Sequence, residues 1–382
     1  MKHHQYNQHF QFITDPIEFN KHTEKDLLQY CLGATLYMPG TFKITEKILS
    51  KEMLDVTSIV MCFEDAIHEK DLQDAEINVL EVLKKLSDSI SDKAITINEI
   101  PLIFLRVRNT EQFKNFANKL SRKQASVLSG FVFPKFYSYN AGEYMKMLEA
   151  LSKDLNVFLY GMPILEGKTI AFKETRIYEL LSLKNILLPY KDHILNLRVG
   201  GTDFSALFGV RRGINYSIYD ILSVKDCLVD ILNLFNRTGE EWVISAPVWE
   251  YFLAYKEDDL CQLLKHDIHH SLMVRAPILN DAIDGLLREV ILDKANGFVG
   301  KTIIHPSHAR FVNAMQAVTK EEYDDALQII ETSGGVIKSA KSNKMNEINP
   351  HRSWAKKIVS RAKVFGVIEN ETSYLELFSA KI

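Results

Sequence analysis

Eight short apolar runs recur along the chain, and segments with helical periodicity separate them. One of these segments, residues 71–86, carries its apolar side chains on a single helical face: Leu72, Ala75, Val79, Leu80, Leu83 and Leu86. Near-continuous apolar strands that alternate with amphipathic helices predict a parallel sheet covered on its outer faces. The predicted strands are Ala34–Met38, Ser58–Phe63, Leu102–Val107, Gly130–Phe133, Val157–Leu165, Ile194–Val199, Trp242–Ala246 and Gly297–Ile304.

Eight strand–helix units favour closure into a (β/α)8 TIM barrel over an open doubly wound sheet, and such a barrel takes about 250 residues. The chain has 382 residues, enough for this α/β domain and an appendage. We therefore expect an N-terminal extension over residues 1–32, a TIM-barrel catalytic domain over 33–330, and a linker with a C-terminal helical extension over 331–382.

The C-terminal region differs in composition from the rest of the chain. Residues 332–344 are rich in Gly, Ser and Lys, which is typical of a mobile connection. Apolar residues then recur with helical spacing among Lys and Arg residues, at Trp354, Ile358, Ala362 and Phe365. This pattern predicts a basic amphipathic helix that either closes over the barrel mouth as a lid or packs on the barrel's flank.

Two acidic residues stand where apolar runs end. Glu166 follows the fifth predicted strand, and Asp203 follows the sixth. In a closed parallel barrel both carboxylates would converge on one mouth and offer hard oxygen ligands to a divalent cation such as Mg²⁺. The alternative is local, because Glu166 could cap the following helix and Asp203 could open a turn.

Seven short motifs fall at the predicted strands: Leu36-Tyr-Met-Pro-Gly40, Phe63-Glu-Asp-Ala66, Leu105-Arg-Val107, Phe133-Pro-Lys135, Pro163-Ile-Leu-Glu166, Gly200-Gly-Thr-Asp-Phe204 and Gly300-Lys-Thr-Ile-Ile-His-Pro306. In this order they resemble the signature segments of the HpcH/HpaI aldolase and citrate lyase family, in particular its citrate lyase β-subunit branch. The resemblance runs from about residue 33 to residue 315.

The resemblance implies a role for each motif. Glu166 and Asp203 would bind Mg²⁺ or Mn²⁺, and Arg106 would contact the carboxylate or carbonyl oxygen of the substrate. Glu64 and Asp65 would hold metal-bound water and substrate from behind the metal ligands.

Further substrate contacts are expected from Gly201 and Thr202, in the motif after the sixth strand. Lys135 could add a positive charge at the rim of the site, or it could form a structural ion pair with a neighbouring carboxylate. The chain departs from the usual pattern of the branch at Cys62, where an acid is common, and at Gly167, where a threonine is common. The nearest histidine after the second strand is His68, so the general base stays unassigned.

These expectations predict a carbon–carbon bond lyase or condensing enzyme of the aldol or Claisen type. Bond cleavage beside a carbonyl passes through an enolate, whose oxyanion must be stabilised. The expected substrate is a small 2-oxo or 3-hydroxy carboxylic acid or its coenzyme A thioester. Arg211 and Arg212, after the sixth strand, could clamp the phosphates of coenzyme A or could be a solvated pair. Two alternatives stay open, a phosphoenolpyruvate-type phosphoryl-transfer barrel and a non-catalytic scaffold subunit.

Composition limits the possible partners. With 46 Lys and Arg against 49 Asp and Glu, the net charge of −3 gives no reason to expect nucleic acid or an anionic membrane. Four scattered cysteines without a Cys-x-x-Cys pair indicate buried free thiols rather than disulfides. No apolar run approaches the ~18 residues of a membrane span. We expect a soluble cytoplasmic protein and, from the resemblance, a homo-oligomer.

Other chemistry-bearing residues have simpler interpretations. Gly300-Lys-Thr302 lacks the first glycine of a phosphate-binding loop, because Ala295 occupies that position. The histidines at 266, 269 and 270 have no acid or cysteine to complete a metal site and indicate a surface helix end. Trp249 and Glu250, after the seventh strand, either line the pocket or pack against its rim.

Overall fold

The computed structural model describes residues 1–252, 279–339 and 345–378. Cys261 and the three histidines at 266, 269 and 270 lie outside the described residues. The other three cysteines, Cys31, Cys62 and Cys227, are buried free thiols, as expected. In the described part of the chain, no helix is long and apolar enough to cross a membrane.

Eight parallel strands form the central sheet, in the order β7-β6-β5-β4-β3-β2-β1-β8. A parallel bridge between Ala246, just after β7, and Lys301 on β8 joins the two ends of this sheet. The prediction of an eight-stranded TIM barrel is therefore confirmed. The strands are β1 Ala34–Pro39, β2 Ser58–Cys62, β3 Leu102–Arg106, β4 Gly130–Phe133, β5 Tyr160–Leu165, β6 Leu197–Val199, β7 Ile244–Ser245 and β8 Lys301–Ile303.

Burial on both faces explains the apolar strand sequences. Every residue of β2, β3, β4 and β5 is buried, since one face of each strand points into the barrel and the other packs under helices. Four strands begin later than predicted: β5 at Tyr160 and β6 at Leu197 by three residues, β7 at Ile244 by two and β8 at Lys301 by four. In the first case Phe158 is half exposed and stacks on His193 outside the sheet.

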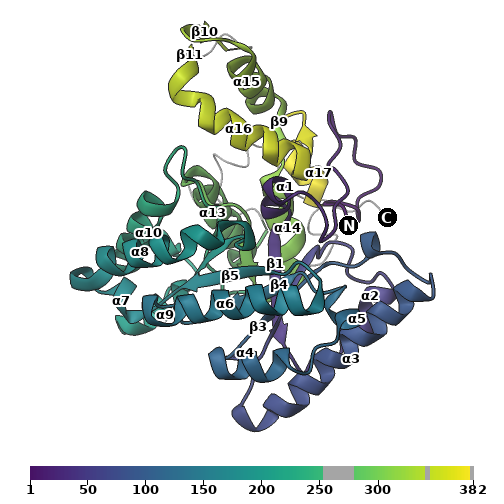
Figure 1. Cartoon of the computed structure of the whole chain (residues 1–382). Helices are drawn as coiled ribbons and strands as arrows, with labels where there is room; N and C mark the ends of the chain where they lie inside the picture. Colours follow the sequence, from purple (N-terminus) through teal and green to yellow (C-terminus); the bar gives the residue numbers. More distant parts are fainter. Residues whose placement is uncertain (253–278, 340–344, 379–382) are drawn as a thin grey trace.

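Helices surround the sheet in the region of the barrel (Figure 1). The helix predicted over residues 71–86 is α3, which buries Ala75, Val79, Leu83 and Leu86. The helices from the amino terminus to α14 are α1 Lys25–Cys31, α2 Thr45–Leu49, α3 Leu72–Ser91, α4 Thr110–Ala117, α5 Arg122–Ala125, α6 Ser138–Leu155, α7 Lys168–Ala171, α8 Lys173–Leu187, α9 Gly201–Leu207, α10 Leu222–Phe235, α13 Asp281–Ala295 and α14 Ser307–Gln316.

The C-terminal region contributes an appendage with its own small core. Figure 1 shows α15 and α16 as a pair that stands away from the barrel, with β10 and β11 at its far end. Apolar residues of both helices form a second cluster that includes Ala326, Ile329, Ala355 and Ile358. The elements of this region are β9 Val318–Thr319, α15 Lys320–Glu331, β10 Val336–Lys338, β11 Met345–Glu347, α16 Ile348–Phe365, β12 Val367–Ile368 and α17 Ser373–Phe378.

The end of α16 packs at the face of the barrel where the strands begin. It contacts α1, which leads directly into β1, and β12 pairs with β9. His3 of the N-terminal segment stacks on Phe365 with ring centroids 4.4 Å apart. The expected amphipathic helix is present, but in this chain its carboxyl-terminal part meets the barrel at the amino-terminal end, opposite Glu166. It does not lie over the mouth of its own barrel, and a lid over a neighbouring subunit stays a prediction.

We predict that α16 stabilises the fold through its last turn. Phe365→Ala should lower the free energy of unfolding by about 3–5 kcal/mol, because Phe365 is fully buried against His3. The matched control is Trp354→Ala on the same helix, since Trp354 is 38% exposed and should cost much less. Urea unfolding of both variants measures the difference. Equal stability losses would contradict the packing described above.

Candidate functional site

A cavity of about 440 Å³ opens at the carboxyl-terminal end of the barrel strands. Most of the sequence motifs contribute residues here, because parallel strands direct their following loops to one face. The lining residues are Tyr37, Met38, Pro39, Cys62, Asp65, Ala66, Arg106, Ile164, Glu166, Arg198, Val199, Gly200, Gly201, Thr202, Asp203, Val248, Thr302 and Ile304.

Glu166 and Asp203 come together over the backbone of Gly200. A methyl group in place of the Gly200 hydrogen would lie 2.5 Å from Glu166 Oε2 and 3.1 Å from Asp203 Oδ2. Glycine is therefore required at position 200 for both carboxylates to occupy these places. The backbone N–H of Lys135, a residue with a left-handed φ of 46°, donates a 2.8 Å hydrogen bond to Glu166 Oε1. These contacts hold the Glu166 carboxylate in one orientation.

Burial makes the charge on Glu166 costly. Glu166 is 4% exposed, and this burial raises its pKa to about 8; Arg106 opposes the rise and Asp203 adds to it. Two adjacent carboxylates in such a place are acceptor-only oxygen ligands, which suit a hard divalent cation. Among the described residues no group of three His, Cys, Asp or Glu side chains surrounds a metal position. A cation held by this pair would take its remaining ligands from water or substrate.

Arg106 lies at the centre of the acidic residues. Its Nη2 is 2.6 Å from Glu64 Oε2, 3.2 Å from Asp65 Oδ2 and 3.6 Å from Glu166 Oε1. Burial disfavours the charged guanidinium, but the negative charges led by Glu166 outweigh it and raise the pKa of Arg106. Its buried Nε has no partner within the described parts of the chain. Arg106 is thus held as a permanent cation beside the carboxylate pair.

The two acids after β2 have different environments. Glu64 is buried, whereas the Asp65 side chain is 60% exposed at the edge of the cavity. Burial and the neighbouring Asp65 raise the pKa of Glu64. Burial also opposes ionisation of Asp65, but its hydrogen bond with Glu64 and the Arg106 and Lys135 charges hold its pKa below the usual value. The two pKa values are therefore shifted in opposite directions, and Glu64 is the more readily protonated of the two acids.

Of the two alternatives for Lys135, a free positive charge at the rim or an ion pair with a neighbouring carboxylate, the structure shows the ion pair. Its Nζ contacts a Glu64 carboxylate oxygen and lies 3.5 Å from Asp65 Oδ1. Gly201 and Thr202 line the cavity, and the Thr202 hydroxyl donates a 2.9 Å hydrogen bond to Glu250. The structure thus places every expected metal-binding and substrate-binding residue at one end of the barrel.

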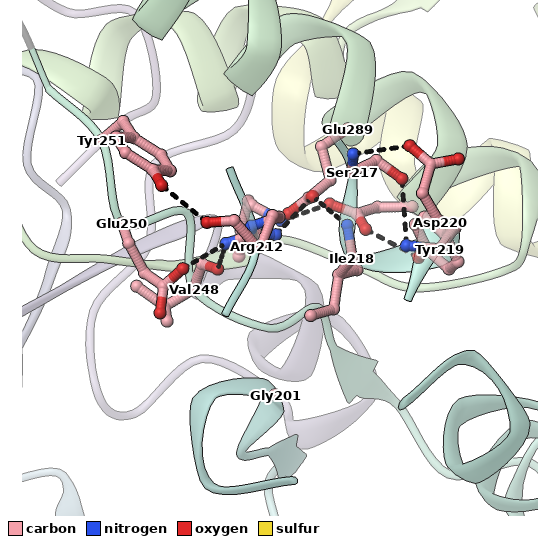
Figure 2. A network of polar contacts seen from close by, with 12 residues as sticks. Gly201, Arg212, Ser217, Ile218, Tyr219, Asp220, Val248, Glu250, Tyr251 and Glu289 are labelled. Carbon is pink, nitrogen blue, oxygen red and sulfur yellow. Dashed lines mark hydrogen bonds and ion pairs between the residues drawn. The ribbon is translucent and has the colours of Figure 1, made fainter. Parts of the chain in front are cut away.

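The surroundings of Arg212 differ from those expected for a residue that binds coenzyme A phosphates. Figure 2 shows it inside a polar network, where its guanidinium contacts Glu289, the Val248 carbonyl and, at 3.2 Å, Glu250. Its side chain is only 2% exposed and lies over the Trp249 ring. Both Nη atoms of Arg212 thus have carboxylate or carbonyl partners in its own chain, which favours a structural role over the predicted contact with coenzyme A phosphates. Arg211 beside it is exposed and stays a candidate for an anion.

The same network explains Lys301 and Trp249. Lys301 donates 2.8 Å hydrogen bonds to both Glu289 and Asp293, so it is a buried ion-pair partner and not a phosphate ligand. Trp249 is fully buried between Arg212 and α13, where it packs against Gly285. Of the two readings left open for Trp249, packing is the one that the structure shows.

Sequence reasoning missed Arg198, which lines the same cavity from β6. The signal was present, because a charged residue interrupts the apolar run Leu197-Arg-Val199 just as Arg106 interrupts the run of β3. A buried arginine in a barrel strand is costly unless an anion faces it.

Solved structures share this fold at low sequence identity. The CitE protein from Mycobacterium tuberculosis, in complex with magnesium, acetoacetate and coenzyme A, is 14% identical with a TM-score of 0.52 and covers 87% of this chain and 99% of its own. Malate synthase from Haloferax volcanii is 12% identical with a TM-score of 0.51 and covers 75% of each chain. No curated protein matches the chain significantly. At these identities the likeness shows the barrel fold alone.

The family match is broader. Residues 26–367 match the family described as C-C bond lyase of the TIM-barrel fold. This range includes the whole barrel, the cavity and most of the C-terminal appendage. The chain therefore belongs to the family of carbon–carbon bond lyases with the TIM-barrel fold.

Proposed function

We propose that this protein is a Mg²⁺-dependent lyase or condensing enzyme for a small 2-oxo or 3-hydroxy carboxylic acid or its coenzyme A thioester. The observation that carries the proposal is the meeting of Glu166 and Asp203 over Gly200, directly beside the Arg106 guanidinium. This arrangement provides two metal ligands and a cation for a substrate oxygen in one cavity. The lyase family of the chain and the magnesium and coenzyme A named for its CitE neighbour support the same chemistry.

Each side chain has a defined task in this proposal. A divalent cation held by Glu166 and Asp203 would act as a Lewis acid on the substrate carbonyl. Arg106 offers a planar, charged fork for a substrate oxyanion. Glu64, whose pKa is raised, and Asp65, whose pKa is lowered, are the acids beside Arg106 that would accept or donate a proton in this proposal. Lys135 keeps Glu64 in position through its ammonium group and Glu166 through its backbone N–H.

Two rivals have weaker support. Phosphoryl transfer would need a phosphate cradle, and the basic residues best suited to one, Arg212 and Lys301, are already saturated by Glu289 and its neighbours. A non-catalytic scaffold would have no use for a buried carboxylate at Glu166 whose charge is costly. The exposed Arg211 stays a candidate for contact with a coenzyme A phosphate.

The first prediction concerns the cation. Isothermal titration of the protein with Mg²⁺ or Mn²⁺ should show one divalent site per chain. Glu166→Gln/Asp203→Asn should abolish it, because amides replace both charged ligands. The control is Glu149→Gln, which changes an exposed carboxylate on α6 and should leave the titration unchanged. Unaltered binding by the double variant would remove the basis of the proposal.

The second prediction is a pH dependence of stability in the metal-free protein. The pKa of Glu166 is raised from its ordinary value to about 8, so the folded state binds this proton more tightly than the unfolded chain does. Stability from this group is fully present below about pH 4.5, falls as pH rises from there, and is lost once pH reaches about 8. In EDTA, the melting temperature of the wild type should therefore fall relative to Glu166→Gln as pH is raised through this range.

Saturating Mg²⁺ should reduce this fall in the wild type, because the cation compensates the carboxylate charge. Glu149→Gln again serves as the control and should keep the wild-type profile. Parallel profiles of wild type and Glu166→Gln in EDTA would contradict the assigned burial and charge of Glu166.

The third prediction tests Arg106 as a catalytic residue. Enolate formation can be followed without knowing the natural substrate, by the Mg²⁺-dependent exchange of the C3 protons of a 2-oxo acid into deuterated water. Arg106→Lys should slow this exchange about 30- to 1,000-fold while the fold and metal binding persist, because a lysine loses the two-pronged geometry.

Arg108→Lys is the matched control, since the Arg108 side chain donates hydrogen bonds to the Phe63 and Ile67 carbonyls and not to the acidic residues of the site. It should change stability more than exchange. A large drop in the melting temperature of Arg106→Lys with unchanged exchange per folded molecule would favour the scaffold alternative.

A further inference from the structure

Arg198 is a cation inside the barrel that the proposed chemistry does not use. It lies on β6 between Ile164 of β5 and Ser245 of β7, and its residue surface is 1% exposed. Its guanidinium nevertheless forms part of the cavity wall. Arg198 therefore faces the same space as Arg106, Glu166 and Asp203.

The contacts of Arg198 are with neutral groups. Nη2 donates a 2.6 Å hydrogen bond to the Thr302 hydroxyl, and Nη1 donates a 3.4 Å bond to the Thr35 hydroxyl. The guanidinium lies 5.4 Å from the centre of the Tyr37 ring, and Nε is buried without a partner in the described residues. Within the same described ranges, no carboxylate forms an ion pair with Arg198.

Two other buried arginines, Arg176 and Arg212, show how this chain can neutralise a buried guanidinium. Arg176, on α8, contacts Asp226 at 2.7 Å and Asp230 at 2.8 Å. Arg212 contacts Glu289 and Glu250. Each is neutralised by its own chain, which offsets the cost of burying its charge. Arg198 has only hydroxyl groups and an aromatic ring around it, so its charge is left for an anion that the folded chain does not supply.

The level of Arg198 in the barrel indicates which part of a ligand it meets. Its strand neighbour is Ile164, two residues before Glu166, and it precedes Gly200 by two residues. Two residues along a strand correspond to about 7 Å, so Arg198 lies one layer deeper than the Glu166 and Asp203 carboxylates. An anion at Arg198 is thus a second group, separate from the one beside Arg106.

We propose that Arg198, with the Thr302 and Thr35 hydroxyls, forms a second carboxylate-binding subsite at the floor of the cavity, and that the substrate is a dicarboxylic acid. One end of such an acid would lie at Arg106 and the metal ligands, and the distal carboxylate would reach Arg198. The assignment of the near end rests on the proposed function. The subsite itself rests on the buried, unneutralised guanidinium.

Stability gives a test that needs no substrate. Arg198→Met removes a buried charge and keeps a side chain of similar length, so the ligand-free variant should melt at the same temperature as the wild type or higher. Arg176→Met is the matched control, because it leaves Asp226 and Asp230 without their shared cation and should melt lower. A marked fall in the melting temperature of Arg198→Met would overturn the proposal and make Arg198 a structural residue.

Binding gives the second test, with two acids that differ only at the distal end. 2-Oxoglutarate ends in a carboxylate where 2-oxopentanoate ends in a methyl group. Calorimetry on the Mg²⁺-loaded protein should show tighter binding of 2-oxoglutarate. Arg198→Met should weaken 2-oxoglutarate about 10- to 100-fold, the loss of one charge-assisted contact, and leave 2-oxopentanoate unchanged. Arg176→Met should preserve the preference for the dicarboxylate.

The outcomes separate the two proposals. Equal binding of both acids by the wild type, or an equal loss for both in Arg198→Met, would overturn the subsite and leave the proposed function intact. Binding that ignores Mg²⁺ would contradict the proposed function. In that case, a preference for 2-oxoglutarate that Arg198→Met abolishes would still support the subsite.

Discussion

The closeness of Glu166 and Asp203 over Gly200 is the contact on which the rest of the site depends. Two carboxylates meet there because β5 and β6 are hydrogen-bonded neighbours that run in the same direction, so both chains leave the barrel at one face. Burial then makes the charge on Glu166 costly, which is reflected in its raised pKa. Arg106 and the backbone N–H of Lys135 compensate part of that charge. A divalent cation would compensate the remainder.

The barrel contains two clusters of buried charged residues with different roles. One surrounds the cavity and includes the guanidinium of Arg198, which forms no ion pair with a carboxylate of the described residues. The other joins Glu289 of α13 to Arg212, as Figure 2 shows, and also to Lys301, so that both cations have a carboxylate partner. The two clusters differ in function for a physical reason. A buried ion pair stabilises the loop that it joins, whereas a buried charge without a partner needs a ligand.

The sequence predicted the barrel well because burial on both faces leaves a strong apolar signal in each strand. It also predicted the convergence of Glu166, Asp203 and Arg106, since residues after parallel strands must share one face. It failed for Arg212, because an exposed-looking Arg-Arg pair does not reveal that Glu289, 77 residues further on, lies beside one of them. The sequence did not predict where α16 packs. An amphipathic pattern indicates that one face of a helix is buried, but it does not identify the surface that buries it.

Arg198 could have been found from sequence by the argument that singled out Arg106. Its importance, however, depends on what is missing from its surroundings, and that requires Thr35 of β1 and Thr302 of β8 to be seen around it. The strands that carry these three residues, β1, β6 and β8, also contribute apolar residues to the core of the barrel. Distance along the chain hides such contacts, and closure of the barrel creates them.

The most direct test of the account is a crystal structure of the protein with Mg²⁺ and 2-oxoglutarate. The account predicts a cation coordinated by Glu166 and Asp203, a substrate oxygen at Arg106, and the distal carboxylate at Arg198. A cation bound elsewhere, with the Glu166 and Asp203 carboxylates left without it, would contradict the central claim.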